Sequence, residues 1–268
     1  VFTSAAKRQH GWFPRWLISR MDAVICTSEQ AAQFVPNSTA VVPHGVSVQR
    51  FTPPTNKLLA WTDRNPSDER HFSELRGRYG IGLFGRVRPE KGTHVFVHAL
   101  IQALPHLPDV TAVIAGLAQP QHQAYQQDLQ AKINAAGLQD RIVFLGEVPA
   151  SHIHEWYRRC LVAVACPRYE AFGLTAFEAA ACGCALICTR TGAFEDLVQP
   201  GLNGELVNAE DHQALAQAML KVLQSPEHAA AMGQAALHKV RQQFSLEHEA
   251  AGIAKVYRQM WSNTLTHS

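Results

Sequence analysis

The chain has 268 residues, of which 47% are hydrophobic and 17% are charged. This is enough apolar material for a sizeable core, which excludes a disordered chain. The formal net charge is only +2 and the basic residues are dispersed, so the composition argues against nucleic acid as a partner and leaves an anionic small ligand open.

The first 48 residues contain a few short patterns of helix and strand. They predict a helix at 13–21, a strand at 23–26, a short helix capped by Ser28 and a strand at 39–42. Such pieces could pack only against a sheet whose other strands are missing. We therefore interpret residues 1–48 as the C-terminal remnant of an N-terminal domain.

A connector is expected over residues 49–80. Its middle part, residues 52–66, is polar, contains three prolines and shows no clean period. A domain boundary is therefore expected there.

Residues 81–245 alternate between apolar strands and helices. The predicted strands are 81–84, 111–115, 142–145, 161–166 and 185–188. The predicted helices are 93–104, 121–135, 151–159, 174–181, 211–224 and 226–244. This alternation predicts an α/β fold, with a parallel sheet covered by helices on both faces. A last helix, at 246–261, begins a separate C-terminal segment, 246–268.

The six cysteines do not form a disulfide pattern. They lie in or beside apolar strands and helices, without the spacing of a small secreted scaffold, which favours a reducing cytosol. Cys182, Cys184 and Cys188 are close together, but no histidine lies near them in the sequence. We therefore expect small buried apolar residues there and no metal site.

The most informative segment joins the strand 161–166 to the helix 174–181. Glu170 and Glu178 lie eight positions apart in it. Their charge has the wrong sign for a phosphate, but carboxylates accept hydrogen bonds well from the hydroxyls of ribose or a hexose. At the positive end of the helix, unpaired N–H groups would stabilise a phosphate. These N–H groups belong to Gly173, Leu174 and Thr175.

Two cations follow the first strand of the predicted sheet. Arg86 and Lys91 flank the turn there, at the carboxyl edge of the sheet, where open α/β folds bind ligands. The stretch from Gly85 to Gly92 is neither a P-loop nor a dinucleotide fingerprint, so it does not predict ATP or NAD. The alternative is that both are solvated surface cations, as Glu178 could be a solvated helix glutamate.

Glu170 and Glu178, with the intervening Phe172-Gly173-Leu174, resemble the E-x7-E motif of retaining GT-B glycosyltransferases of glycosyltransferase family 4. Further segments that agree in order and spacing are 42–46, 84–92, 113–116, 143–146 and 191–198. Segments 3–6, 16–25 and 78–82 most resemble bacterial lipopolysaccharide-core mannosyltransferases of that family. The resemblance spans the chain from about residue 2 to residue 261.

This resemblance implies a GT-B fold, with one Rossmann-like parallel-sheet domain at 81–245 that binds a nucleotide-sugar and the tail of a second one. It also implies that roughly the first third of the usual enzyme is absent from this chain. The last helix would cross back to the N-terminal domain, with Tyr257 and Trp261 as its anchors. The implied reaction is retaining transfer of a hexose, mannose from GDP-mannose, to a lipopolysaccharide-core or glycolipid acceptor. No metal and no cofactor beyond the substrate is expected.

The resemblance also implies roles for individual residues. Glu170 would bind hydroxyls of the transferred sugar, and Glu178 those of the ribose. Arg86 and Lys91 would stabilise the leaving diphosphate, so the implied catalytic residues are Glu170, Arg86 and Lys91. The full implied donor-binding set is Arg86, Lys91, Gly146, Glu147, Val148, Glu170, Phe172, Gly173, Leu174, Thr175 and Glu178.

Two alternatives stay open at this point. Residues 146–148, which resemble the base-contacting stretch, do not decide between guanine and uracil, so the donor could be a UDP-sugar. The chain could also be an inactive donor-binding fragment.

The start of the chain mixes cations with aromatic residues, a composition suited to an anionic membrane surface or glycolipid. These residues are Lys7, Arg8, His10, Trp12, Phe13, Arg15, Trp16 and Arg20. An ordinary amphipathic helix explains them too. We expect a cytoplasmic protein, peripheral on the inner face of the cytoplasmic membrane.

Overall fold

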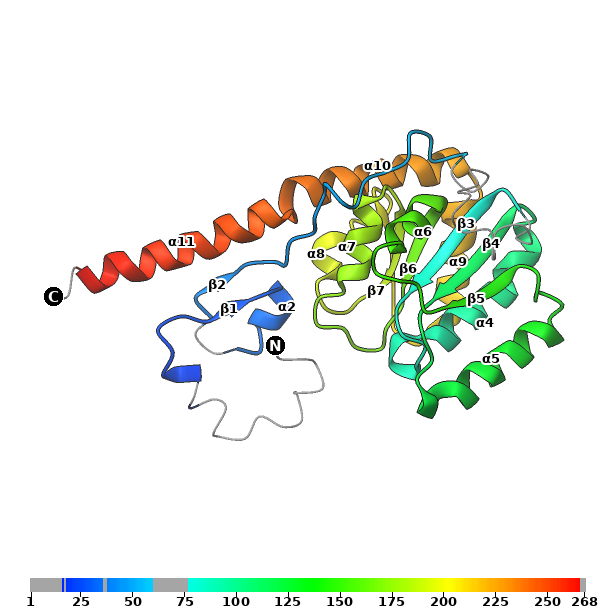
Figure 1. The fold of residues 1–268 in the computed structure, drawn as a ribbon, viewed down its shortest axis with the longest axis horizontal. Coiled ribbons are helices and arrows are strands. Elements are labelled where there is room, and N and C mark those ends of the chain that lie inside the picture. Colours follow the sequence, from blue (N-terminus) through cyan, green and yellow to red (C-terminus); the bar gives the residue numbers. More distant parts are fainter. Residues whose placement is uncertain (1–15, 17, 36–37, 60–76, 266–268) are drawn as a thin grey trace.

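The computed structural model describes residue 16 and residues 18–35, 38–59 and 77–265. Its largest part is built on a six-stranded sheet in the order β5-β4-β3-β6-β7-β8, and every neighbouring pair is parallel (Figure 1). The strands are β3 (Tyr79–Phe84), β4 (Val110–Ala115), β5 (Ile142–Gly146), β6 (Cys160–Ala165), β7 (Ala185–Thr189) and β8 (Gly204–Val207). The predicted α/β class is confirmed.

Helices cover both faces of this sheet. One face packs against α4 (Thr93–Ala103), α5 (Gln123–Ala135) and α9 (His212–Leu223), and the other against α6 (Ile153–Arg159), α7 (Leu174–Ala181) and α10 (Pro226–Gln243). Successive strand residues point to opposite faces. In β4, for example, Ala112 and Ile114 join the first core, whereas Val113 and Ala115 join the second.

The strand order reverses direction between β3 and β6. The chain builds outward from β3 through β4 to β5 and then returns to the other side of β3 as β6. The connections that leave β3 and β6 therefore run in opposite directions, which leaves a crevice at the carboxyl ends of these two strands. The loop after β3 carries Lys91, and the loop after β6 carries Glu170.

Two short elements of this domain were not predicted. β8 has the sequence Gly-Glu-Leu-Val and forms the sheet edge, and α8 (Phe194–Leu197) has only four residues. Neither is long enough to show a hydrophobic period.

A second, smaller unit is formed by the N-terminal residues. β1 (Ile25–Cys26) pairs in parallel with β2 (Ala40–Val41), and Ser28 caps α2 (Glu29–Ala32), as predicted. In Figure 1 this unit lies beside the C-terminal helix α11 (Leu246–Leu265), apart from the six-stranded sheet. Residues 13–15 and 17 of the predicted helix 13–21, and most of the cations and aromatics at the start, lie outside the described residues. The domain limits 1–48, 49–80, 81–245 and 246–268 stay predictions.

The helix α11 is held at its first turns. The N–H group of Val46 donates to the carbonyl of Phe244 (2.8 Å), and Glu249 accepts from the N–H group of Gly45 (2.9 Å). In contrast, Tyr257 and Trp261 are 66% and 75% exposed. Within the described residues, they do not anchor the helix.

All six cysteines are buried and free of disulfides, as expected for small core residues. In the described part of the chain, no helix has the length and apolar character needed to cross a membrane. The same residues contain no group of three or more His, Cys, Asp or Glu that could hold a metal ion.

Candidate active site

Lys91 and Glu170 form an ion pair at the crevice between β3 and β6. Lys91 ends the short turn η3 (Pro89–Lys91), and its Nζ donates to Oε2 of Glu170 at 2.6 Å. The two side chains are 27% and 17% exposed. Solvent and salt screen a pair in this position less than a pair on the surface. The structure thus brings together two of the residues predicted for the site.

Gly92 lets the loops after β3 and β6 touch. Its φ is 72°, and a Cβ at this position would lie 1.9 Å from the carbonyl oxygen of Cys166. The Sγ of Cys166 donates to the carbonyl of Gly92 (3.3 Å), and the N–H group of Arg168 donates to the carbonyl of Glu90 (2.9 Å). Only glycine fits such a close backbone approach. These main-chain contacts fix the loops that carry Lys91 and Glu170.

Further hydrogen bonds orient Glu170. Its N–H group donates to Oγ1 of Thr191, in the loop after β7, at 2.9 Å. Its Oε1 accepts from the N–H group of Ala171 at 3.1 Å. The carboxylate is therefore held by Lys91 on one oxygen and by the backbone on the other, a preorganised acceptor for a hydroxyl group.

The loop ends at Gly173, the residue before α7. Gly173 has a φ of 87°, and a Cβ here would lie 2.3 Å from the ring of Phe194 and 3.1 Å from Cγ of Glu170. For the N–H groups of Gly173, Leu174 and Thr175, no acceptor is recorded in the part of the chain that the structure describes. They remain suited to an anion, as the sequence predicted.

Gly173→Ala is expected to destabilise the fold by about 1 to 2 kcal/mol for the left-handed backbone, and further for the contact with Phe194. The matched control is Gly137→Ala, because Gly137 has a φ of 67° and nothing lies within 4 Å of its Cβ position. Urea unfolding of both variants measures the difference. Equal losses would show that Phe194 yields without cost and that the packing at Gly173 is loose.

Glu178 is the fifth residue of α7 and is partly buried. The hydroxyl of Tyr157 donates to its Oε2 at 2.9 Å. Desolvation raises the pKa of Glu178, and the hydrogen bond from Tyr157 and the charge of Arg50 oppose this shift. The carboxylate is therefore not the solvated helix glutamate that the sequence left open.

The ring of Phe172, which was predicted to bind the donor, is buried. Its side chain is 5% exposed, stacks on Phe177 with ring centroids 4.4 Å apart, and meets His44 edge-on at 5.1 Å. The ring therefore belongs to the core, and only the backbone of Phe172 is available to a donor. Leu174, in contrast, is 43% exposed beside the helix start.

Arg86 and the segment 146–148 lie at the same edge of the sheet without joining the ion pair. Arg86 is exposed, and among the described residues none forms a hydrogen bond or an ion pair with its side chain. Gly146 ends β5, two strands away from β3, with Glu147 exposed and Val148 half-buried. Their contacts with a donor stay predictions.

Sequence reasoning missed several residues that support the site. Tyr157 is fully buried and reaches Glu178 from α6. Gln30, in the N-terminal unit, accepts from the N–H group of Gly192 at 2.6 Å, next to the loop of Glu170. His44 contacts Glu249 through Nδ1 at 3.0 Å. These pairs are 21, 162 and 205 positions apart, and no local pattern connects them.

This fold and site define a class of protein. The strand order, the lysine at the crevice, the two carboxylates and the free N–H groups of α7 suit a ligand that carries both phosphate and sugar hydroxyls. Residues 68–239 match the family profile described as Glycosyl transferases group 1. The chain belongs to this family and is a glycosyltransferase.

Two curated relatives are lipopolysaccharide core biosynthesis mannosyltransferases. LpcC of Rhizobium leguminosarum bv. viciae is 42% identical over 260 residues, which cover 97% of this chain and 71% of LpcC. LpsB of Rhizobium meliloti strain 1021 is 38% identical over 262 residues, which cover 97% of this chain and 72% of LpsB.

Solved structures show the same GT-B architecture. The C-terminal domain of the group 1 glycosyltransferase LpcC from Francisella tularensis is 33% identical with a TM-score of 0.69, over 75% of this chain and 100% of that one. Sucrose-phosphate synthase from Thermosynechococcus elongatus is 25% identical with a TM-score of 0.76, over 97% of this chain and 64% of that one. The predicted GT-B fold is confirmed.

Proposed function

We propose that this glycosyltransferase moves mannose from GDP-mannose, with retention of configuration, to a lipopolysaccharide-core or glycolipid acceptor at the cytoplasmic face of the membrane. The observation that carries the transfer site is the Lys91–Glu170 pair at the crevice between β3 and β6. The sugar and the acceptor class are supported by the two relatives, which are lipopolysaccharide core biosynthesis mannosyltransferases.

Lys91 would serve both ends of the scissile bond. An ammonium group has three N–H donors, and Glu170 takes one of them. The others are free to bind phosphate oxygens while Glu170 accepts a hydroxyl of the sugar. When the bond between the sugar and the diphosphate breaks, negative charge grows on the diphosphate, and Lys91 together with the N–H groups of α7 would stabilise it. Arg86 would add a second cation from the solvent side.

Glu178 would bind the ribose. Tyr157 occupies Oε2 of this carboxylate, which leaves Oε1 as an acceptor for a ribose hydroxyl. Because the site is partly buried, a hydroxyl bound there is shielded from water, which strengthens the hydrogen bond.

A panel of nucleotide-sugars tests the donor. GDP-mannose is expected to give release of GDP together with labelled product on lipid extracts, while UDP-glucose and UDP-galactose give neither. Release of UDP would favour the rival donor class. Binding of GDP by calorimetry without any transfer would favour the second rival, a chain that binds donor but does not react.

A further inference from the structure

Glu210 holds an unusual backbone conformation. Its φ is 65°, and it is the one non-glycine residue with a positive φ in the described ranges. It lies in the turn after β8, directly before Asp211, which caps α9. A side chain with a Cβ is disfavoured in this left-handed region, and glycine would adopt it freely. Such strain persists where the surroundings hold the residue in place, and it directs attention to its side chain.

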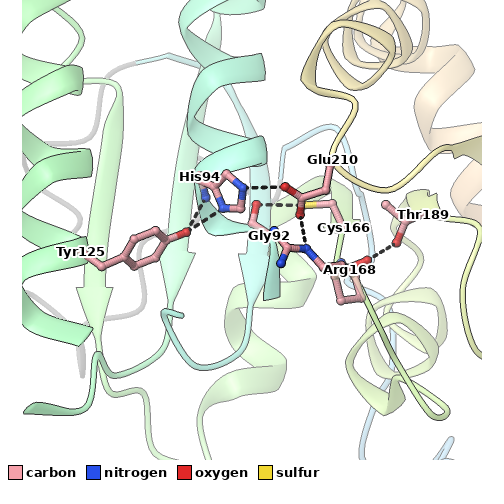
Figure 2. A network of polar contacts seen from close by, with 8 residues as sticks. Gly92, His94, Tyr125, Cys166, Arg168, Thr189 and Glu210 are labelled. Carbon is pink, nitrogen blue, oxygen red and sulfur yellow. Dashed lines mark hydrogen bonds and ion pairs between the residues drawn. The ribbon is translucent and has the colours of Figure 1, made fainter. Parts of the chain in front are cut away.

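The carboxylate of Glu210 bridges the two loops of the candidate active site. Its Oε2 lies 3.0 Å from Nε2 of His94, and its Oε1 accepts from Nε of Arg168 at 3.2 Å (Figure 2). His94 is the second residue of α4, three positions after Lys91, and Arg168 lies two positions before Glu170. One side chain from a third loop therefore connects the segments that deliver both members of the ion pair.

The protons of this bridge have a defined arrangement. Partial burial would raise the pKa of Glu210, but the hydrogen bonds from Arg168 and His94 and the charge of Arg168 hold it below its ordinary value, so the carboxylate only accepts. In the neutral ring of His94, Nε2 then donates to Glu210 and Nδ1 accepts from the hydroxyl of Tyr125 at 2.9 Å. Burial raises the pKa of Tyr125 to about 12, so this hydroxyl keeps its proton.

These contacts also hold the start of α4 in place. The hydroxyl of Tyr125, on α5, accepts from the N–H group of His94 at 2.9 Å, so the first turn of α4 is fixed through both its backbone and its side chain (Figure 2). At the other end, Arg168 is held by its own N–H group on the carbonyl of Glu90 and by its guanidinium on Glu210.

We propose that Glu210 is a positioning residue for sugar transfer, which braces His94 and Arg168 so that Lys91 and Glu170 meet the donor in the reactive geometry. The inference rests on the proposed function for the reaction that it serves. A positioning role explains why a glutamate occupies a turn position whose backbone conformation suits glycine. The contacts of the carboxylate then outweigh the cost of the strained backbone.

The decisive variant is Glu210→Gly, which removes the carboxylate and the backbone strain together. Its melting temperature is expected to equal or exceed that of the wild type, because glycine accepts the left-handed conformation. Its kcat is expected to fall by about tenfold, since small displacements of reacting groups are costly, while the donor KM changes by less than about twofold. A kcat within about twofold of wild type, or a loss of activity that follows a loss of stability, would overturn the proposal.

Two further variants separate positioning from a general effect of the turn. Glu210→Asp keeps a carboxylate on a residue that tolerates the left-handed region, and it is expected to recover part of the lost kcat. Arg168→Ala should also lower kcat, and the double variant with Glu210→Gly should be no worse than the poorer single variant, because both act through one contact. Additive losses would contradict the brace.

A readout without catalysis distinguishes failure of the brace from failure of the proposed function. In the ¹⁵N NMR spectrum, the ring of His94, assigned by comparison with His94→Gln, is expected to show the Nε2–H tautomer in the wild type and a mixture in Glu210→Gly. Unchanged ring signals would overturn the brace. Absence of transfer by the wild type, with the tautomer shift present, would overturn the reaction alone.

Discussion

Lys91→Ala is expected to lower kcat/KM for sugar transfer by about 10²- to 10³-fold, the usual cost of removing one preorganised donor from a site where negative charge develops. The loss has two parts. The leaving diphosphate loses its partly buried cation, and Glu170 loses the partner that holds its carboxylate at 2.6 Å. Steady-state kinetics with labelled donor measure the effect, and kcat should fall more than donor affinity, because the charge grows in the transition state.

Lys221 offers a matched control. It pairs with Glu205 at the same Nζ–Oε distance of 2.6 Å, but its side chain is 60% exposed and lies on α9. Lys221→Ala is expected to leave kcat/KM unchanged within about twofold, because Lys221 lies in the last turn of α9 and takes no part in the site of Lys91 and Glu170. If Lys91→Ala behaved like Lys221→Ala, Lys91 would be a structural lysine and the diphosphate would bind elsewhere.

The sequence predicted the sheet because each of its central strands is a continuous apolar run followed by a helix. Residues 111–115 and 161–166 are short and apolar, which is typical of strands buried on both faces of a parallel sheet, and the structure has them as β4 and β6. The edge strand β8 was not predicted from the sequence, because two of its four residues are only half-buried and its composition is mixed. Strand order also could not be read from local patterns, since it depends on which loops cross the sheet.

The part of the site that could be predicted lies in one short segment, which contains both carboxylates and the glycine that precedes the helix. Glu170, Gly173 and Glu178 fall within nine positions, so their spacing carries the information. The lysine at position 91 was predicted from a different segment, and its contact with Glu170 spans 79 positions. Glu210 was not predicted, because its turn has no glycine or asparagine at that position to reveal the left-handed backbone.

Glu178→Gln is expected to weaken donor binding by about tenfold to a hundredfold, because a hydrogen bond to a charged carboxylate contributes about 1.5 to 3 kcal/mol. Calorimetric titration with GDP measures it. The control is Glu227→Gln, an exposed glutamate in the first turn of α10, which should leave donor affinity unchanged. Equal affinity of Glu178→Gln and the wild type for GDP would show that the ribose does not bind this carboxylate.

Glu178→Gln is also expected to change the pH dependence of GDP binding. Burial raises the pKa of Glu178, so its carboxylate gains a proton at a higher pH than an ordinary glutamate does as the solution is acidified. If the ionised form binds the ribose, wild-type affinity for GDP falls as pH decreases through this raised pKa, and Glu178→Gln lacks that step. Tyr157→Phe removes the hydrogen bond that opposes the shift, so it should move the step to still higher pH. A step that persists in Glu178→Gln would belong to another group and would leave Glu178 without a role in binding.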